Sequence, residues 1–172
     1  DRLLEAGSRV DVLIGDLDSA SDAAKASAKR VVQAPDQDST DCDKLLAFAI
    51  SEGFSELSLA AIEGSLPDHQ LASLQSLSKA EISSRVIYER GIAHILRGPV
   101  EISFFHERRL SLLPIVSCED VSLTGVQWPI DGHLSPTGRS SISNVGLGKV
   151  NAQVGSGAAF LFLETSGIPS WD

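Results

Sequence analysis

The chain has 172 residues, of which 42% are hydrophobic and 22% charged, a composition typical of a globular protein with a buried core. Its 14 Lys and Arg residues against 23 Asp and Glu residues give a net charge of −9, which argues against binding to nucleic acid or to an anionic membrane surface. Two widely separated cysteines, Cys42 and Cys118, predict reduced thiols in a cytoplasmic protein, with neither a disulfide nor a zinc site.

No apolar run approaches the roughly 18 residues that a membrane span needs, and no signal peptide is recognisable. The chain opens on Asp1 and contains no methionine. Because a translation product normally begins with methionine, we expect an N-terminal segment, which could include a first strand, to precede the sequence.

Residues 1–82 alternate between short apolar strands and helices. Strands are predicted at 10–14, 31–32 and 56–62, and helices at 1–7, 21–30, 40–53 and from 67 onward. Such alternation is typical of a parallel sheet with crossover helices. We therefore expect an N-terminal α/β domain with a parallel sheet over 1–82.

An acidic stretch follows the first of these strands. Gly15 breaks the strand, and Asp16 and Asp18 then project to the same side if the backbone stays extended. Two carboxylates so close together repel each other unless a cation lies between them. The pair predicts a divalent metal with a phosphate-bearing substrate. The alternative is an ordinary acidic turn, since Asp and Ser are common turn residues.

A second acidic stretch leads into the helix that begins at Thr40. Thr40 and Asp43 resemble a capping box, with the shorter Asp in place of Glu. The start of this helix offers backbone N–H groups to a phosphate, and Asp38 and Asp41 could hold a metal that bridges it. Magnesium fits best, because it takes one or two carboxylates and leaves other positions to water and phosphates. Alternatively, Asp41 and Asp43 only complement the helix dipole.

From residue 83 the pattern changes to short β segments separated by turns, which predicts an all-β sandwich or barrel over 83–172. The domain boundary is therefore placed near 82. The predicted strands are 85–89, 92–96, 100–106, 110–116, 121–128, 149–154 and 158–164.

Two further groups are candidate ligand contacts. Asp68 and His69 begin a helix after a glycine turn and could contact a phosphate, or they could be a solvated helix start. Trp128 could present a flat ring to a heteroaromatic ligand, with Ser143 and Asn144 supplying hydrogen bonds, or it could plug a core or an interface. The sequence contains no Walker motif, glycine-rich dinucleotide fingerprint or nucleophilic serine elbow.

Five short motifs follow one another along nearly the whole chain. They are Gly15-Asp16-x-Asp18-Ser19, Gln37-Asp38-x-Thr40-Asp41-x-x-Lys44, Gly64 to Asp68-His69, Trp128-Pro129, and Ser143-Asn144. In this order and spacing they resemble the thiamin pyrophosphokinase family, in its bacterial form. The resemblance implies an ATP-binding α/β domain followed by a β-sandwich that helps to bind thiamin. It also implies a homodimer with active sites at the subunit interface, and transfer of an intact pyrophosphoryl group from ATP to the thiamin hydroxyl, which gives thiamin diphosphate and AMP.

The resemblance also assigns roles to individual residues. Those expected to hold Mg²⁺ and the phosphates are Asp16, Asp18, Asp38 and Asp41. Those expected to line the ATP site are Gln37, Thr40, Lys44 and His69. Those expected to bind thiamin are Trp128, by stacking, and Ser143 and Asn144. The catalytic set is Asp16, Asp18, Asp41 and Asp68, and either Asp68 or Asp18 would act as the general base.

The sequence departs from the family pattern at two described motifs. Leu66 stands where the family usually has an arginine before its Asp-His pair, and Val145 follows Ser143-Asn144 where Glu or Thr is common. Leu66 favours an alternative, a thiamin- or nucleotide-binding protein of the same fold with little catalysis. The retained carboxylates favour the enzyme. A third hypothesis is transfer to another heterocyclic alcohol, such as a pterin.

Overall fold

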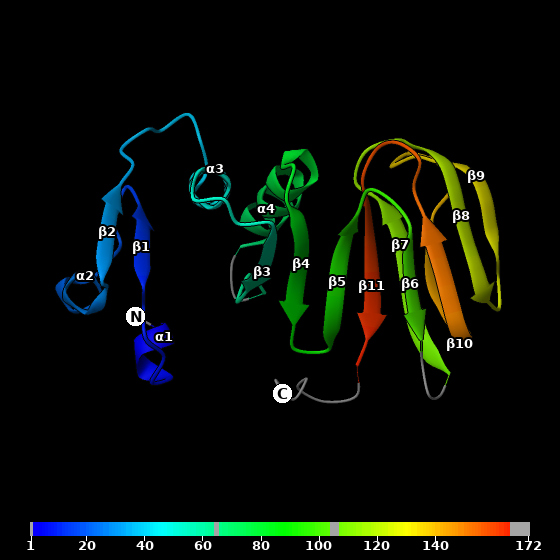
Figure 1. Cartoon of the computed structure of the whole chain (residues 1–172), viewed down its shortest axis with the longest axis horizontal. Coiled ribbons are helices and arrows are strands. Elements are labelled where there is room, and N and C mark those ends of the chain that lie inside the picture. The colour runs from blue at the N-terminus through cyan, green and yellow to red at the C-terminus, as the bar shows by residue number, and fades with distance from the viewer. Residues whose placement is uncertain (1, 64–65, 104–106, 166–172) are drawn as a thin grey trace. The chain divides into compact units, whose positions relative to one another are not determined.

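The computed structural model describes residues 2–63, 66–103 and 107–165, and the chain divides into two compact units, Asp1–Phe54 and Ser55–Asp172 (Figure 1). No helix within the described residues is long and apolar enough to cross a membrane. The predicted turn at residues 64–65 and the end of the strand predicted over 100–106 lie outside the described residues.

The first unit contains a small parallel sheet and three helices among its described residues. Its elements are α1 (Arg2–Glu5), β1 (Val12–Gly15), α2 (Asp22–Ser27), β2 (Arg30–Gln33) and α3 (Asp41–Ser51). Ser21 caps α2, because its Oγ accepts a hydrogen bond from the N–H of Ala24 at 3.1 Å. Leu46 and Ala49 lie on the buried face of α3, which contacts β1. These elements agree with the predicted strands and helices to within a few residues.

The second unit is built mainly from strands. Its elements are β3 (Glu56–Ala60), α4 (Pro67–Lys79), β4 (Ser83–Tyr88), β5 (Gly91–Leu96), β6 (Val100–Ser103), β7 (Arg108–Pro114), β8 (Cys118–Val126), β9 (Ile130–Leu134), β10 (Ser141–Gln153) and β11 (Ala159–Glu164). Its described strands form one mixed sheet in the order β3-β4-β5-β11-β7-β10-β8-β9, and β6 also pairs with β10. Among the described strands of this sheet, only β3 and β4 pair in parallel, and the other pairs are antiparallel.

The long strand β10 pairs with three other strands of the sheet. It pairs with β7 near its beginning, with β6 near its end, and with β8 along its other edge. Leucines such as Leu110, Leu112 and Leu161 are fully buried in the core that these strands enclose. Each such side chain contributes about 1.5–3 kcal/mol to stability. The core therefore holds the ends of β8 and β10 in a fixed relation.

Two parts of the β region differ from the prediction. β9 was not predicted, and β10 begins at Ser141 and not at Lys149. The first part of β10 is rich in Gly, Ser and Asn, and β9 contains Asp and Gly; all of these residues are typical of turns. Their strand structure depends on pairing with β7 and β8, which local propensity does not reveal. β8 also ends at Val126, so that Trp128 lies in the turn before β9.

Candidate active site

Two acidic loops begin at the same end of the β1–β2 sheet. β1 ends at Gly15 and β2 ends at Gln33, and these two residues are paired in the parallel register. The N–H of Ala34 extends the pairing by donating to the carbonyl of Gly15 at 2.8 Å. Both strands point toward this end of the sheet in Figure 1. We call the two loops, residues 16–18 and 36–41, the acidic edge.

The first loop of the acidic edge is a tight turn. Oδ1 of Asp16 accepts a hydrogen bond from the N–H of Asp18 at 3.2 Å, and Leu17 between them has a φ of 67°. This left-handed conformation is uncommon for a residue other than glycine. The backbone from Asp16 to Asp18 is therefore not extended, contrary to what the prediction for this pair assumed. A turn, and not strand alternation, sets the positions of the two carboxylates. Asp16 is half-buried and Asp18 is exposed.

Gly15 allows the two loops to approach each other. Its φ is 151°, and a Cβ atom built on it would lie 3.1 Å from Oδ1 of Asp41. The carboxylate of Asp41 therefore lies against the end of β1, in space that a side chain at residue 15 would fill. This contact brings one carboxylate of the second loop to the strand end from which Asp16 follows.

The capping box at the start of α3 is confirmed. The N–H of Asp43 donates to Oγ1 of Thr40 at 3.1 Å, and Oδ2 of Asp43 accepts from the N–H of Thr40 at 2.9 Å. Asp43 therefore caps the helix, as its spacing from Thr40 predicted. Asp41, in contrast, directs its carboxylate toward Gly15.

Lys44 is a buried cation beside the acidic edge. Its side chain is only 6% exposed, and its Nζ lies 3.7 Å from Oδ1 of Asp41, whose side chain is 74% exposed. A buried ammonium group needs an anionic partner to offset the loss of hydration. Lys44 thus places a positive charge below a carboxylate that faces solvent.

Asp36 shapes the second loop, although the sequence reading assigned it no role. Its Oδ2 accepts from the hydroxyl of Ser39 at 2.5 Å, and its Oδ1 accepts from the N–H of Asp38 at 3.1 Å. These two hydrogen bonds, with a smaller contribution from Lys44, lower the pKa of Asp36. The Asp-x-Asp-Ser spacing, typical of an Asx turn, could have revealed this role. Asp38 and Gln37 remain exposed, and Nε2 of Gln37 donates to the carbonyl of Pro35 at 3.4 Å.

The donor atoms of the acidic edge suit a hard cation. Within the described residues, no three His, Cys, Asp or Glu side chains lie close enough together to form a metal site by themselves. Magnesium, however, commonly takes one or two carboxylates and completes its shell with water and substrate phosphates. The exposed carboxylates of Asp18, Asp38 and Asp41 fit that chemistry.

Asp68 and His69 belong to the second unit, in the first turn of α4. Pro67 occupies the first helical position, as predicted, and Leu66 is the N-cap residue. Oδ1 of Asp68 accepts from the N–H of His69 at 3.0 Å, and both residues are exposed. Leu66 is itself 65% exposed.

Trp128 and Asn144 are joined by a pair of hydrogen bonds. The N–H of Trp128 donates to Oδ1 of Asn144 at 3.1 Å, and Nδ2 of Asn144 donates to the carbonyl of Trp128 at 2.7 Å. Trp128 is 55% exposed, whereas Asn144 is 1% exposed. The ring is therefore accessible to a ligand, while the asparagine that holds its backbone is inside the protein.

Ser143 points the other way from its neighbour. It lies in a bulge of β10 between Ser141 and Asn144, with a φ of 59°. Its Oγ accepts from Nε and Nη2 of Arg109 at 3.2 and 3.1 Å, and its N–H donates to Oγ of Ser111 at 3.1 Å. Arg109 was missed by sequence reasoning, because only the β7–β10 register brings it to Ser143.

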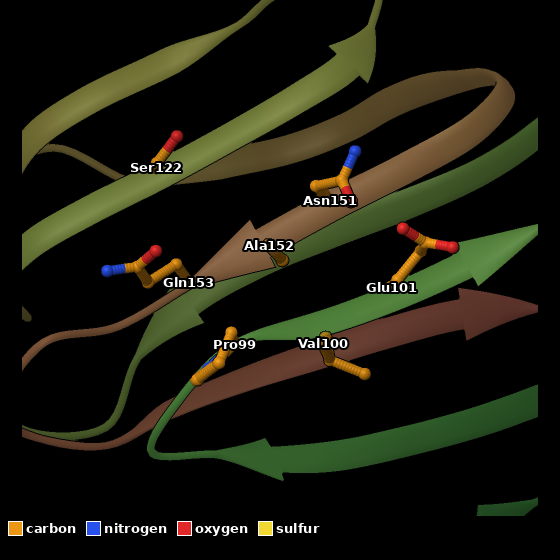
Figure 2. A pocket seen from close by; sticks show the side chains of 7 residues that line it. All are labelled: Pro99, Val100, Glu101, Ser122, Asn151, Ala152 and Gln153. Carbon is orange, nitrogen blue, oxygen red and sulfur yellow. The ribbon is translucent and has the colours of Figure 1, made fainter.

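A separate hollow of about 400 Å³ lies on β6, β8 and β10. Figure 2 shows four polar side chains on it, from Glu101, Ser122, Asn151 and Gln153. Its other lining residues are Pro99, Val100 and Ala152. The lining thus consists of residues other than those predicted for ATP, thiamin or magnesium.

The fold is shared with solved thiamin pyrophosphokinases. The structure from Bacillus subtilis is 23% identical, with a TM-score of 0.78, and the match covers 96% of this chain and 83% of that one. The structure from Geobacillus thermodenitrificans is 20% identical, with a TM-score of 0.76 and coverage of 96% and 82%. That from Candida albicans is 13% identical, with a TM-score of 0.75 and coverage of 96% and 77%. The chain thus shares with these structures a mostly stranded fold with few helices.

Family models identify the particular family. The thiamin pyrophosphokinase catalytic domain matches residues 1–88, and the thiamin pyrophosphokinase vitamin B1 binding domain matches residues 94–158. A search of curated proteins found no match. Because the catalytic-domain model alone spans more than half of the sequence, the chain belongs to the thiamin pyrophosphokinase family.

Proposed function

We propose that this chain transfers a pyrophosphoryl group from ATP to the hydroxyl of thiamin, giving thiamin diphosphate and AMP. The observation that carries the proposal is the succession of a catalytic and a vitamin B1 binding domain of one family along the chain. The exposed carboxylates after β1 and β2 and the exposed ring of Trp128 supply groups suited to the two substrates.

The finer architecture is part of the same proposal. We assign ATP binding to an α/β domain over 1–82 and thiamin binding to a β-sandwich over 83–172. The family models change over between residues 88 and 94, a few residues after this boundary. β4, which follows the boundary, pairs in parallel with β3 and antiparallel with β5.

For the nucleotide, we assign Mg²⁺ and phosphate binding to Asp16, Asp18, Asp38 and Asp41. A bound Mg²⁺ would neutralise phosphate charge and stabilise the charge that develops on the AMP leaving group. The first N–H groups of α3, together with Thr40, Gln37 and Lys44, would hold phosphate oxygens or the nucleotide. We assign His69 to the ATP site as well, since it is exposed in the first turn of α4.

The thiamin hydroxyl must lose a proton as it attacks the phosphorus. Asp18 and Asp68 are both exposed carboxylates that could accept it. An asparagine at the base position would abolish the proton transfer. Loss of the Asp18 carboxylate would leave other carboxylates at the acidic edge, whereas Asp68 is the only acidic residue in the first turn of α4.

Trp128→Ala is expected to weaken thiamin binding by roughly 1–3 kcal/mol, the range for stacking of a base on an aromatic ring. Trp128 is 55% exposed and is not part of the buried core, so removal of its ring disturbs little of the core. Isothermal titration calorimetry with thiamin measures the effect, and Trp128→Phe, which keeps a flat ring, is the control. Unchanged thiamin affinity in Trp128→Ala would assign the ring to an interface or core role.

Leu66→Arg is expected to lower the KM for ATP by about threefold to tenfold, because a guanidinium near the phosphates adds charge-assisted hydrogen bonds. Leu66 is 65% exposed, so the fold should tolerate the change. Steady-state kinetics at several ATP concentrations measure it, with Leu66→Gln as an uncharged control. An unchanged KM in Leu66→Arg would mean that residue 66 lies away from the phosphates.

A coupled assay for AMP release tests the reaction itself. The purified chain is supplied with ATP, Mg²⁺ and thiamin, and thiamin is omitted in the control. Thiamin-dependent AMP release is the expected result. Thiamin binding without AMP release would favour the binding-protein alternative, and faster release with a pterin alcohol than with thiamin would favour the other acceptor.

We also propose that the chain is a homodimer, as the family resemblance implies, and that it acts in the cytoplasm, as its two separated cysteines indicate. Sedimentation velocity on the purified chain tests the first point. A single species at the mass of one 18.2 kDa chain, over the concentration range of the kinetic assays, would contradict it.

A further inference from the structure

Asn144 uses its side chain entirely for hydrogen bonds within the protein. A carboxamide has two N–H donors and two acceptor positions on its oxygen. Nδ2 donates to the carbonyl of Trp128 at 2.7 Å and to Oγ of Ser141 at 2.9 Å. Oδ1 accepts from the N–H of Trp128 at 3.1 Å and from the N–H of Val145 at 2.8 Å. All four positions are therefore occupied, and the residue is 1% exposed.

Two of these bonds fix both peptide groups of Trp128. Its N–H and its carbonyl are held by one rigid, buried side chain, and the neighbouring Gln127 donates to the carbonyl of Val145 at 2.8 Å. The turn after β8 is thus tied to β10 at consecutive residues. Trp128 as a whole residue is nevertheless 55% exposed, so its backbone is held while the residue remains open to solvent.

Ser143 and Asn144 face opposite sides of β10, at the bulge between Ser141 and Asn144. Ser143 has a φ of 59° and is exposed, and its Oγ accepts from the Arg109 guanidinium. Asn144 turns inward to Trp128. Direct binding of a ligand by Asn144 would require breaking at least one buried hydrogen bond, which is costly.

We propose that Asn144 is a positioning residue that orients Trp128 for stacking on thiamin and does not itself contact the ligand. This inference rests on the proposed function, and it replaces the direct contact that the family resemblance implied for Asn144. Ordering the ring before thiamin arrives reduces the entropy that binding must overcome. The Arg109–Ser143 pair lies on the exposed side of the same bulge, where a ligand could reach it.

The experiment first examines Trp128 without ligand. The chain has two tryptophans, and Trp171 lies outside the described residues, so Trp171→Phe makes Trp128 the sole indole reporter. Asn144→Ala removes the four side-chain hydrogen bonds of Asn144, and Asn144→Asp keeps the size of the side chain but removes its two N–H donors. Asn151→Ala, an exposed asparagine further along β10 (Figure 2), is the matched control. Fluorescence anisotropy and acrylamide quenching should report a more mobile and accessible ring in both Asn144 variants only.

Thiamin titrations and ATP kinetics then separate positioning from general damage. In the Asn144 variants the Kd for thiamin should rise roughly tenfold or more, because the peptide groups of Trp128 lose their partners. The KM for ATP should change by less than about twofold, because the hydrogen bonds of Asn144 hold Trp128, Ser141 and Val145 and none of the residues assigned to ATP. If an Asn144 variant fails to fold, Ser141→Ala removes one bond to Nδ2 and should shift anisotropy and thiamin Kd in the same direction by a smaller factor.

Three results would overturn the inference. The first is weaker thiamin binding with unchanged Trp128 anisotropy, which would show that Asn144 contacts the ligand directly. The second is a more mobile Trp128 ring with unchanged thiamin affinity. The third is a rise in the KM for ATP equal to the rise in the Kd for thiamin. A wild-type chain that binds no thiamin would refute the proposed function instead, while the ligand-free fluorescence would still show whether Asn144 holds Trp128.

Discussion

Replacing Asp16 or Asp18 by asparagine is expected to lower the rate of thiamin-dependent AMP release by roughly 10²-fold or more, because charge stabilisation of the transferring phosphates is lost. Asparagine has nearly the same shape as aspartate. At residue 16 its amide oxygen can still accept the hydrogen bond from the N–H of Asp18. The turn is therefore retained, and the change removes charge alone.

The free energy of unfolding should change by less than about 0.5 kcal/mol in both variants, as is usual for surface substitutions. Chemical denaturation measures it, and AMP release at saturating substrates measures the rate. Asp11→Asn is the matched control, because Asp11 is an exposed aspartate just before β1, at the opposite end of that strand. It pairs with exposed Lys29 at 2.5 Å, a type of contact that contributes little to stability.

Wild-type turnover in both Asp16→Asn and Asp18→Asn would show that the stretch is only an acidic turn. A rise in the KM for ATP with unchanged maximal rate would assign the carboxylates to nucleotide binding and not to the transfer step. A lower maximal rate together with a higher KM for ATP in the Asp11→Asn control would point to a general effect of lowered negative charge.

Gly125→Ala is expected to lower the free energy of unfolding of the second unit by about 3–5 kcal/mol, through backbone strain and a steric clash together. Gly125 has a φ of 72°, and a Cβ atom there would lie 1.9 Å from the carbonyl oxygen of Lys149. That oxygen belongs to β10, which is paired on both sides and cannot move aside cheaply.

Urea denaturation followed by tryptophan fluorescence measures this loss in the unit that contains Trp128. Gly132→Ala is the control, since Gly132 has a φ of 99° but a Cβ atom there would have no described neighbour within 4 Å. It should cost only the backbone strain, about 1–2 kcal/mol. Equal losses in the two variants would mean that β8 and β10 separate easily at this point. Thiamin affinity should fall in Gly125→Ala as well, because Gly125 lies only three residues before Trp128.

Local features were predictable because their partners lie within a few residues. The capping box of Thr40 and Asp43 closes over one helical turn, and Pro67 begins α4 with a φ that suits the first helical position. The acidic residues after β1 and β2 were likewise visible, since Gly15 marks the end of the first strand and Pro35 follows the second. The geometry of the first turn was not predictable, because it depends on the left-handed backbone of Leu17.

The sequence by itself determined the family resemblance, the order of strands and helices over 1–82, and the carboxylates of the acidic edge. Only the tertiary structure decided that Asp41 lies against Gly15, that Arg109 binds Ser143, and that Asn144 faces inward. The physical reason is register. Each of these contacts joins residues far apart in the chain, and in β10 a single bulge determines which of two adjacent polar residues faces the core and which faces solvent.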